Sequence, residues 1–181
     1  NTTRRHLNVL VNYLHEHGFD VQKSTLKTRK QNETLHKPIN DVKGLLDEVC
    51  CFNKNLHLCC LLTYCCLLRP HQEIRRLKWS DFSEDLKTIS LSGSKVKSKR
   101  NRVVPVPIYI RELLIKGEPH HNIFTDTIRP LNEDYFKTLW SRFKRVSKLL
   151  EQDQTLYSFR HSGAIEIFKR TGSITKLQKA M

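Results

Sequence analysis

This chain of 181 residues lacks an apolar run long enough to span a membrane, a signal peptide at its start and any low-complexity run that would indicate disorder. Its length suits one ordinary domain and a short appendage. Acidic residues are scarce, because 18 Asp and Glu stand against 32 Lys and Arg, a net charge of +14. This excess favours a polyanionic partner, most often nucleic acid. The alternative is a basic protein that its charge merely keeps soluble.

The chain also lacks the cysteine spacings of a zinc site. Its six cysteines form three adjacent pairs at 50–51, 59–60 and 65–66, with no CxxC and no Cys/His pattern. Neighbouring cysteines do not readily bond to each other, and these lie in apolar stretches of helical pattern. We therefore expect reduced thiols that pack as small hydrophobic groups in a cytosolic compartment. The sequence likewise contains no carboxylate cluster typical of a metal site.

The first part of the chain predicts one helix and a linker. Leu7, Leu10, Val11 and Leu14 share one face of a helix within residues 1–18 that stops at Gly18. This helix has too few neighbours to form a domain, so we expect it to be the end of a domain cut away upstream. Residues 19–38 read as a polar, aperiodic, basic linker that carries Lys27, Arg29 and Lys30.

Residues 39–181 predict a mainly α-helical domain with a small antiparallel β-hairpin. Asn40 or Asp41 can cap a first helix through about Cys51, and the nearly all-apolar segment 56–68 predicts a buried second helix. Residues 71–82 read as a short helix that runs into a turn. Alternating residues predict strands at 86–92 and 102–107, and further helices are expected at 108–116, 132–150, 157–171 and from Ser173 onward.

Two arginines stand at places where a positive charge requires an explanation. Arg69 follows a buried helix and precedes Pro70, and a charge at the edge of the core is costly unless it is paired or faces a ligand. The alternative is an arginine that caps the last carbonyls of its helix. Arg160 lies in "LYSFRHSGA", on the first turn of a helix, where the helix dipole disfavours a cation but favours a bound anion. The alternative is a surface helix with a basic residue.

Basic residues also gather at two further places. The loop between the two predicted strands is dense in cations and contains no acid, whereas the predicted helix 132–150 has an apolar stripe and an opposite cationic face. Both patterns suit contact with phosphates, and both also occur on solvated turns and faces. The cations are Lys95, Lys97, Lys99, Arg100 and Arg102 in the loop, and Lys137, Lys144, Arg145 and Lys148 on the helix.

Three of these segments, taken in order, resemble the signature boxes of the tyrosine recombinase (phage integrase) family. They are "LLRPHQEIRRLKWSDF", "SKVKSKRNRVVPVP" and "LYSFRHSGA". The resemblance implies the DNA breaking-rejoining fold of that family, with residues 39–181 as a catalytic domain truncated at its C-terminus. It also implies that residues 1–18 are the end of a helical core-binding domain and that residues 19–38 are the linker between the two.

The resemblance also implies roles for individual residues. Arg69 and Arg160 would clamp the scissile phosphate, and Lys97 would be the hairpin lysine that acts as general acid. Tyr157 stands where the family usually has a histidine; a phenol still donates a hydrogen bond but is a poorer proton shuttle near neutral pH. His161 and Glu73 would support the site. Glu73 lies one residue further from Arg69 than the usual acid, so either the segment has an insertion or Glu73 lacks the usual role.

One part of the family pattern is missing, namely the nucleophilic tyrosine that follows the last box. Only 21 residues follow Arg160, and beyond His161, which lies in the last box itself, none is Tyr, His or Trp. The chain also starts without Met and stops inside a helical pattern, so we expect a fragment that is inactive as it stands. The remaining tyrosines occupy other positions: Tyr13, Tyr64, Tyr109 and Tyr135.

The resemblance implies site-specific DNA recombination or integration through a 3′-phosphotyrosyl intermediate, without metal or cofactor. The implied partners are double-stranded DNA and further copies of the protein, as dimers and tetramers that exchange C-terminal segments; this fragment would be a monomer. The implied location is the bacterial cytoplasm, at the nucleoid. One alternative is a DNA-binding module of a degenerate recombinase or an excisionase-like protein. A second is an RNA-binding helical domain, which is weaker because no RRM-type aromatic box or KH-type GxxG loop is present.

Overall fold

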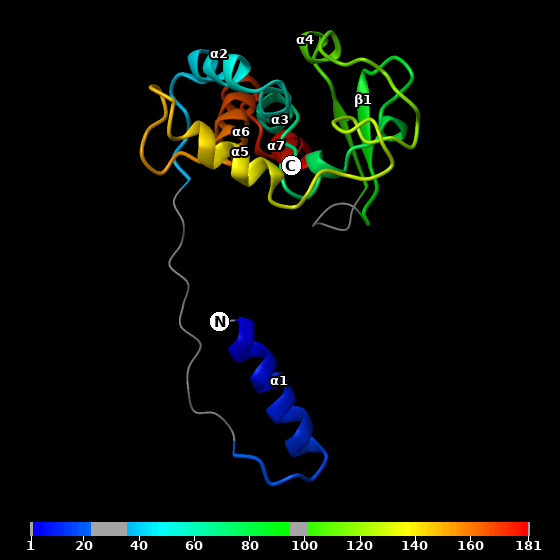
Figure 1. The fold of residues 1–181 in the computed structure, drawn as a ribbon, viewed down its shortest axis with the longest axis vertical. Coiled ribbons are helices and arrows are strands. Elements are labelled where there is room, and N and C mark those ends of the chain that lie inside the picture. The colour runs from blue at the N-terminus through cyan, green and yellow to red at the C-terminus, as the bar shows by residue number, and fades with distance from the viewer. Residues whose placement is uncertain (1, 23–35, 95–100, 181) are drawn as a thin grey trace. The chain divides into compact units, whose positions relative to one another are not determined.

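Two compact units make up the chain in the computed structural model, which describes residues 2–22, 36–94 and 101–180. Residues 1–35 form the first unit and residues 36–181 form the second. Helix α1 belongs to the first unit, and every other helix and strand of the described residues belongs to the second (Figure 1). The second unit begins at His36, slightly before the catalytic region expected from residue 39.

Helix α1 (Thr2–Glu16) is the helix predicted at the N-terminus. It ends before Gly18, whose φ of +80° is readily adopted by glycine and rarely by other residues. Leu7 and Leu10, on its apolar face, are each 53% exposed. The described part of the first unit therefore leaves this apolar face largely uncovered.

Side-chain caps start the first two helices of the second unit. Asp41 Oδ1 accepts a backbone N–H at 2.9 Å and starts α2 (Val42–Phe52), as one of the two predicted caps. Asn53 closes α2, and its side chain also accepts a backbone N–H at 2.9 Å to start α3 (Lys54–Cys65). Because one residue ends a helix and begins the next, α2 and α3 pack against each other as a helical hairpin.

Helix α3 ends earlier than the predicted segment 56–68, because the chain turns sharply after it. Leu67 has a φ of +50°, a left-handed conformation that ends helices and is rare in residues other than glycine. The N–H of Leu68 returns to the carbonyl of Leu62 at 3.3 Å, and both Leu67 and Leu68 are buried. The turn thus sets the direction of the chain from residue 69 onward.

The segment expected as a short helix and a turn forms two 3-10 turns, η1 (Ile74–Arg76) and η2 (Trp79–Asp81). Asp81 Oδ2 accepts the N–H of Lys78 at 3.0 Å and stabilises the second turn. The side chains of Ile74, Leu77 and Trp79 are buried in the core. The segment is therefore held by packing rather than by a continuous helix.

The predicted hairpin forms between β1 (Thr88–Leu91) and β2 (Arg102–Pro105), which pair antiparallel with Leu91 opposite Arg102. Both strands are shorter than the predicted 86–92 and 102–107. Ile89, Leu91 and Val104 are buried, as expected for one apolar face of a two-stranded sheet. Figure 1 shows this hairpin and α4 beside the group of helices formed by α2, α3, α5 and α6.

Two of the later helices are shorter than the sequence predicted. Helix α4 (Ile108–Arg111) is a single turn, and α5 (Tyr135–Phe143) covers only the middle of the expected 132–150. After α5, the Glu48 carboxylate of α2 accepts hydrogen bonds from the Ser147 hydroxyl and the Lys148 N–H. The Lys148 N–H therefore bonds to Glu48 instead of to a helical carbonyl, and Val146 in this segment is 61% exposed.

Helix α3 lies at the centre of the second unit and packs against α2, α4, α5 and α6. Helix α6 (Ser158–Thr171) comes especially close to it, because a side chain at Gly163 would overlap the carbonyl oxygen of Tyr64. Helix α7 (Ile174–Ala180) follows Gly172, which has a φ of +61°. The described residues thus form the mainly α-helical fold with a small antiparallel hairpin that the sequence predicted.

All six cysteines are free, as expected, but they do not all pack in the core. Cys59, Cys60 and Cys66 are buried, and Cys65 is partly buried. Burial raises the pKa of these thiols above the usual range. Cys50 and Cys51 are exposed, so the prediction of buried thiols was wrong for this pair.

Candidate active site

The left-handed turn after α3 brings two predicted site residues together. Arg69 follows the turn, and its side chain is 22% exposed. The carbonyl of Leu67, at the turn itself, accepts a hydrogen bond from Nη1 of Arg160. Arg160 comes from the first turn of α6, so two arginines far apart in the sequence lie at one edge of the core.

A buried carboxylate holds this edge. The side chain of Glu73 has no exposed surface, and its Oε1 lies 2.7 Å from Nη1 of Arg69. Its Oε2 accepts from the backbone N–H of Arg69 at 2.9 Å and from Nη2 of Arg102 at 3.0 Å. A buried carboxylate that accepts several charge-assisted hydrogen bonds fixes its donors strongly. Glu73 therefore positions Arg69.

Arg160 is almost completely buried, with 1% of its surface exposed. Burial lowers the pKa of its guanidinium; the charges of Arg69 and Arg102 also lower it, whereas Tyr157 and Glu73 oppose them. These influences show that Arg69, Arg102 and Arg160 lie within electrostatic reach of one another. We call these three residues and Glu73 the arginine centre.

The arginine centre is suited to an anion. Burial tends to lower the pKa of Arg69, but its hydrogen bond to Glu73, that carboxylate's charge and an interaction with the Tyr157 phenol raise it overall. Guanidinium groups stay charged at neutral pH and offer several donors in a rigid fork. Within the part of the chain that the structure describes, two such groups donate to the Glu73 carboxylate and Arg160 lies near enough to interact with its charge, which is a favourable setting for a phosphate oxygen.

Tyr157, rather than Ser158, is the residue just before α6. The next residue, Ser158, is buried and its hydroxyl accepts the N–H of Thr155 at 2.9 Å. The ring of Tyr157 lies 5.9 Å from Cζ of Arg160. His161 is exposed and its ring lies 5.4 Å from that of Tyr157. The predicted site residues of this helix thus lie together beside the arginine centre.

Arg102 was predicted as a DNA contact of the hairpin, but the structure gives it a different setting. Its side chain is 10% exposed and donates to Glu73 from the start of β2. Burial lowers the pKa of this guanidinium, and the Glu73 charge opposes that effect. The sequence contained a signal for this position, because Arg102, Val104 and Val106 alternate along one strand face and both valines are buried.

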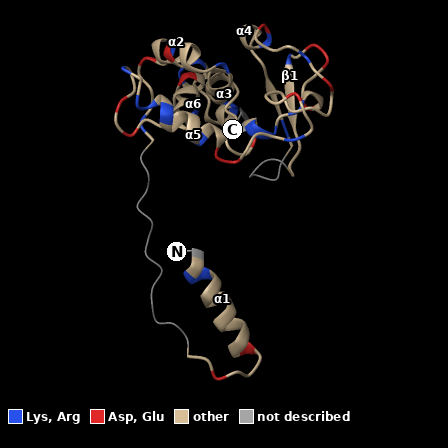
Figure 2. Ribbon diagram, viewed as in Figure 1, with Lys and Arg blue, Asp and Glu red and all other residues tan. Residues whose placement is uncertain are grey.

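The cations predicted on one helix face do not share a helix. Lys137, Lys144, Arg145 and Lys148 are all exposed, but α5 ends at Phe143, so only Lys137 lies in the helix and Lys144 borders it. Residues 135–150 nevertheless contain five Lys or Arg and no acid. Figure 2 shows basic segments on α5 and acidic segments in the loops near α4 and β1. Charge is therefore distributed unevenly over the second unit.

Several predicted residues lie outside the described part of the chain. They include the proposed general acid and most of the basic loop and linker, so the structure does not place them. These residues are Lys27, Arg29, Lys30, Lys95, Lys97, Lys99 and Arg100.

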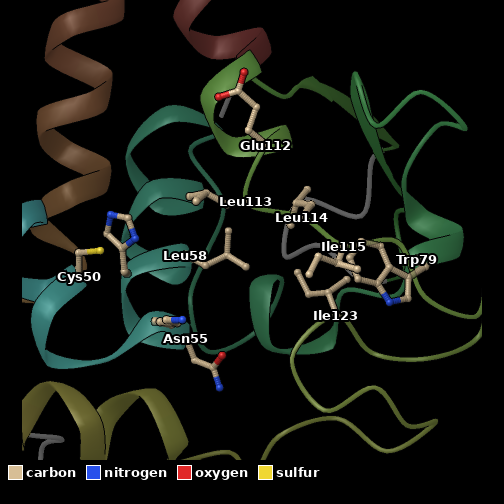
Figure 3. Close-up of a pocket in the computed structure, with 11 residues that line it drawn as sticks. Cys50, Asn55, Leu58, Trp79, Glu112, Leu113, Leu114, Ile115 and Ile123 are labelled. Carbon is tan, nitrogen blue, oxygen red and sulfur yellow. The ribbon is translucent and has the colours of Figure 1, made fainter.

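Away from the arginine centre, a cavity of about 510 Å³ lies between the α2–α3 hairpin and the chain after α4 (Figure 3). Leu58, Leu114 and Ile123 point into it, and none of the arginine centre residues lines it. Across the described ranges, no group of three or more His, Cys, Asp or Glu side chains is placed to hold a metal ion. None of the helices in those ranges combines the length and hydropathy that a bilayer-spanning segment needs.

Comparison with known proteins gives one family match and several similar structures. The model of the phage integrase family matches residues 36–181. No curated protein sequence matches the chain. A lambda integrase dimer bound to a COC′ core site has a TM-score of 0.76 at 17% identity, covering 98% of this chain and 54% of that one. The XerH site-specific recombinase bound to difH has a TM-score of 0.68 at 16% identity, covering 98% of this chain and 56% of that one.

A third structure, the Tn1549 transposon integrase with transposon right end DNA, has a TM-score of 0.63 at 13% identity. The alignment covers 100% of this chain and 70% of the transposon integrase chain. The chain spans little more than half of the lambda integrase and XerH chains. At these identities the likeness shows the fold, and the family match extends over the whole second unit. The chain belongs to the phage integrase family, the tyrosine recombinases.

Proposed function

We propose that the full-length protein is a site-specific DNA recombinase that breaks and rejoins phosphodiester bonds through a 3′-phosphotyrosyl intermediate. The observation that carries this proposal is the meeting of Arg69 and Arg160 beside the buried carboxylate of Glu73. Membership of the tyrosine recombinase family supports the reaction class. The excess of basic residues supports duplex DNA as the partner.

The arginine centre would act on the transition state. When a tyrosine oxygen attacks phosphorus, negative charge gathers on the non-bridging oxygens of the phosphate. Arg69 and Arg160 would donate to these oxygens from fixed positions, which stabilises the transition state without a metal ion. Tyr157 would donate a further hydrogen bond from its phenol. Glu73 and the Leu67 carbonyl would hold the two guanidinium groups in place.

The leaving group needs a proton, and we assign this step to Lys97, as the resemblance implies. The bond between phosphorus and the 5′ oxygen breaks, and the Lys97 ammonium would protonate that oxygen as a 5′-hydroxyl. A 5′-hydroxyl of the partner strand then attacks the phosphotyrosyl bond and releases the tyrosine. The Lys97→Ala variant should cleave slowly, and a 5′-sulfur leaving group should restore its rate. Rescue of Lys99→Ala but not of Lys97→Ala would assign the role to Lys99.

The nucleophilic tyrosine would come from a part of the full-length protein outside these 181 residues. Apart from Tyr157, the tyrosines of the second unit have other surroundings: Tyr135 accepts from Asn55 at 3.0 Å, and Tyr109 lies 2.8 Å from the Cys65 sulfur. The residues before the second unit would belong to a core-binding domain and its basic linker. Lambda integrase forms a dimer on a core site and a tetramer on a Holliday junction, and we expect similar assemblies of the full-length protein on DNA.

A suicide-substrate trap tests the proposal. Full-length protein is mixed with a nicked DNA site from which the cleaved fragment diffuses away, and covalent complex is counted on a denaturing gel. We expect the full-length protein to form the complex and Arg160→Ala to form none, while its DNA affinity falls only modestly. Full cleavage by Arg160→Ala would contradict the clamp. DNA binding by the full-length protein without any covalent complex would support the second candidate, a DNA-binding module without catalysis.

A further inference from the structure

The segment before α2 is bound tightly to the start of α6. The Pro38 carbonyl accepts from Nε2 of Gln154 at 3.0 Å, and the N–H of Ile39 donates to the Ser162 hydroxyl at 2.7 Å. Ile39 itself is buried in the core. These bonds fix the chain at residues 36–39, so the position of the His36 side chain follows from the fold.

The His36 ring lies against the aromatic residues that border the arginine centre. Its centroid is 5.5 Å from that of Tyr157 and 5.7 Å from that of His161, with an interplanar angle of 22° to His161. Its Nδ1 lies 3.0 Å from the Thr155 hydroxyl. Tyr157 and His161 are themselves in ring contact. We call His36, Tyr157 and His161 the three-ring cluster.

Tyr157 is the member of this cluster that faces the arginines. Arg160 Cζ lies 5.9 Å from its ring, and its phenol interacts with Arg69. The Tyr157 ring therefore has both guanidinium groups and two imidazole rings around it. These contacts restrict a ring that would otherwise adopt several rotamers.

Open space beside Tyr157 makes this restriction necessary. A cavity of about 420 Å³ is bordered by Tyr157, His36 and Thr155, together with Pro70 and Trp140. Removal of the His36 ring would join its volume to this cavity. The Tyr157 ring would then have room to turn away from Arg69.

We propose that His36 is a positioning residue, whose ring holds the Tyr157 phenol toward Arg69 and Arg160. The cleavage experiment below rests on the proposed recombinase function. The ring contact itself can be measured in the protein without DNA and does not depend on that function. His36 lies outside the three boxes that carry the family resemblance, and the sequence alone assigned it to the linker. His36 acts through the contact of its ring with Tyr157, so the ring of a phenylalanine at position 36 should preserve the positioning.

The first measurement uses full-length, DNA-free protein with ¹³C-labelled tyrosine. In His36→Ala the ring resonances of Tyr157 should shift and broaden, and in His36→Phe they should return toward a single ordered state. The matched control is His120→Ala, which removes an exposed histidine elsewhere on the second unit and should leave these resonances unchanged. Unchanged Tyr157 resonances in His36→Ala would overturn the proposal, whatever the protein does to DNA.

The second measurement is single-turnover cleavage of a suicide substrate by the full-length protein. We expect His36→Ala to cleave about tenfold more slowly, since misplaced groups cost at least this much, with DNA affinity changed less than about twofold. His36→Phe should come within about threefold of the unaltered protein. Equal loss in His36→Phe and His36→Ala would overturn positioning by ring contact.

A double-mutant cycle separates positioning from general stability. If His36 acts through Tyr157, His36→Ala should slow cleavage no further once Tyr157→Ala is present. A full tenfold loss in both backgrounds would show that His36 acts independently of Tyr157 and would sink the proposal. If the unaltered protein does not cleave DNA, the recombinase function is refuted. The Tyr157 resonances would still test whether His36 holds the Tyr157 ring in place.

Discussion

At the scale of single residues, Glu73 holds the arginine centre together. It is the fully buried partner of Arg69 and Arg102, which come from the chain just after the turn that follows α3 and from the start of β2. When one partner of a buried ion pair is removed, the remaining charge is costly, because neither water nor another group takes the place of the lost partner. The stability of the unit and the geometry of the centre therefore depend on the same carboxylate.

We expect Glu73→Gln to lower the free energy of unfolding by about 3 kcal/mol, because two buried or partly buried guanidinium groups lose their carboxylate. Urea denaturation of the 181-residue chain measures the loss. Glu133→Gln is the matched control, since Glu133 is 82% exposed in its ion pair with Arg75, and its loss should stay below about 1 kcal/mol. Equal losses in the two variants would show that Glu73 contributes no more than a surface charge.

At the scale of elements, the approach of α6 to α3 sets the position of Arg160. Gly163 allows this approach, because any side chain there would meet the Tyr64 backbone of α3. Arg160 lies one turn before Gly163 on α6 and reaches the Leu67 carbonyl at the end of α3. A wider gap between these helices would withdraw Arg160 from the centre.

Gly163→Ala should therefore reduce stability by at least about 2 kcal/mol, because the overlap involves backbone and cannot be relieved by a rotamer change. Thermal and urea unfolding of the 181-residue chain would measure it. Gly172→Ala is the control: it has open space around it but a φ of +61°, so only backbone strain of about 1 kcal/mol applies. A Gly163→Ala loss smaller than that of Gly172→Ala would show that the helices separate easily.

Helix ends were the least predictable part of the elements. Among the described residues the sequence predicted the position of each α-helix, but it also predicted a short helix within 71–82 that forms two 3-10 turns. It extended the second helix of the catalytic region past Cys65 and the later one past Phe143. In both places the apolar pattern continues, whereas the chain turns because of contacts far away in sequence. Leu67 turns so that its carbonyl meets Arg160, and Ser147 binds Glu48 of α2.

At the scale of the whole molecule, several histidines favour the folded state at neutral pH. Partial desolvation lowers the pKa of His57, His71 and His161 below the ordinary value of 6.5. The unfolded chain therefore binds protons first as the pH falls through that value, so stability decreases on acidification. We expect the urea midpoint to be lower at pH 5.5 than at pH 7.5. Replacing the three histidines by Gln should flatten this dependence, and a midpoint that rises on acidification would contradict it.

DNA binding should depend steeply on salt, because lysines and arginines that contact phosphates release counterions. We expect Lys144→Ala to reduce the slope of log K against log salt by about 1 in the full-length protein. Lys116→Ala is the control, since the Lys116 ammonium donates to the Glu84 carbonyl and the residue lies between Glu112 and Glu118 in sequence, outside the basic segment 135–150. If log K for the unaltered protein does not change with log salt, phosphate contacts do not drive DNA binding. If Lys116→Ala lowers the slope as much as Lys144→Ala, the two lysines do not differ in their contact with DNA.

Amphipathic periodicity, helix caps and strand alternation determined the elements from the sequence alone, since these patterns are local. The three boxes likewise identified Arg69, Arg160 and the family. Tertiary structure alone decided that Glu73 is the shared partner of Arg69 and Arg102, and that His36 reaches Tyr157. The physical reason is that buried charges and ring contacts depend on which distant segments meet when the core packs, and spacing along the chain does not contain that information.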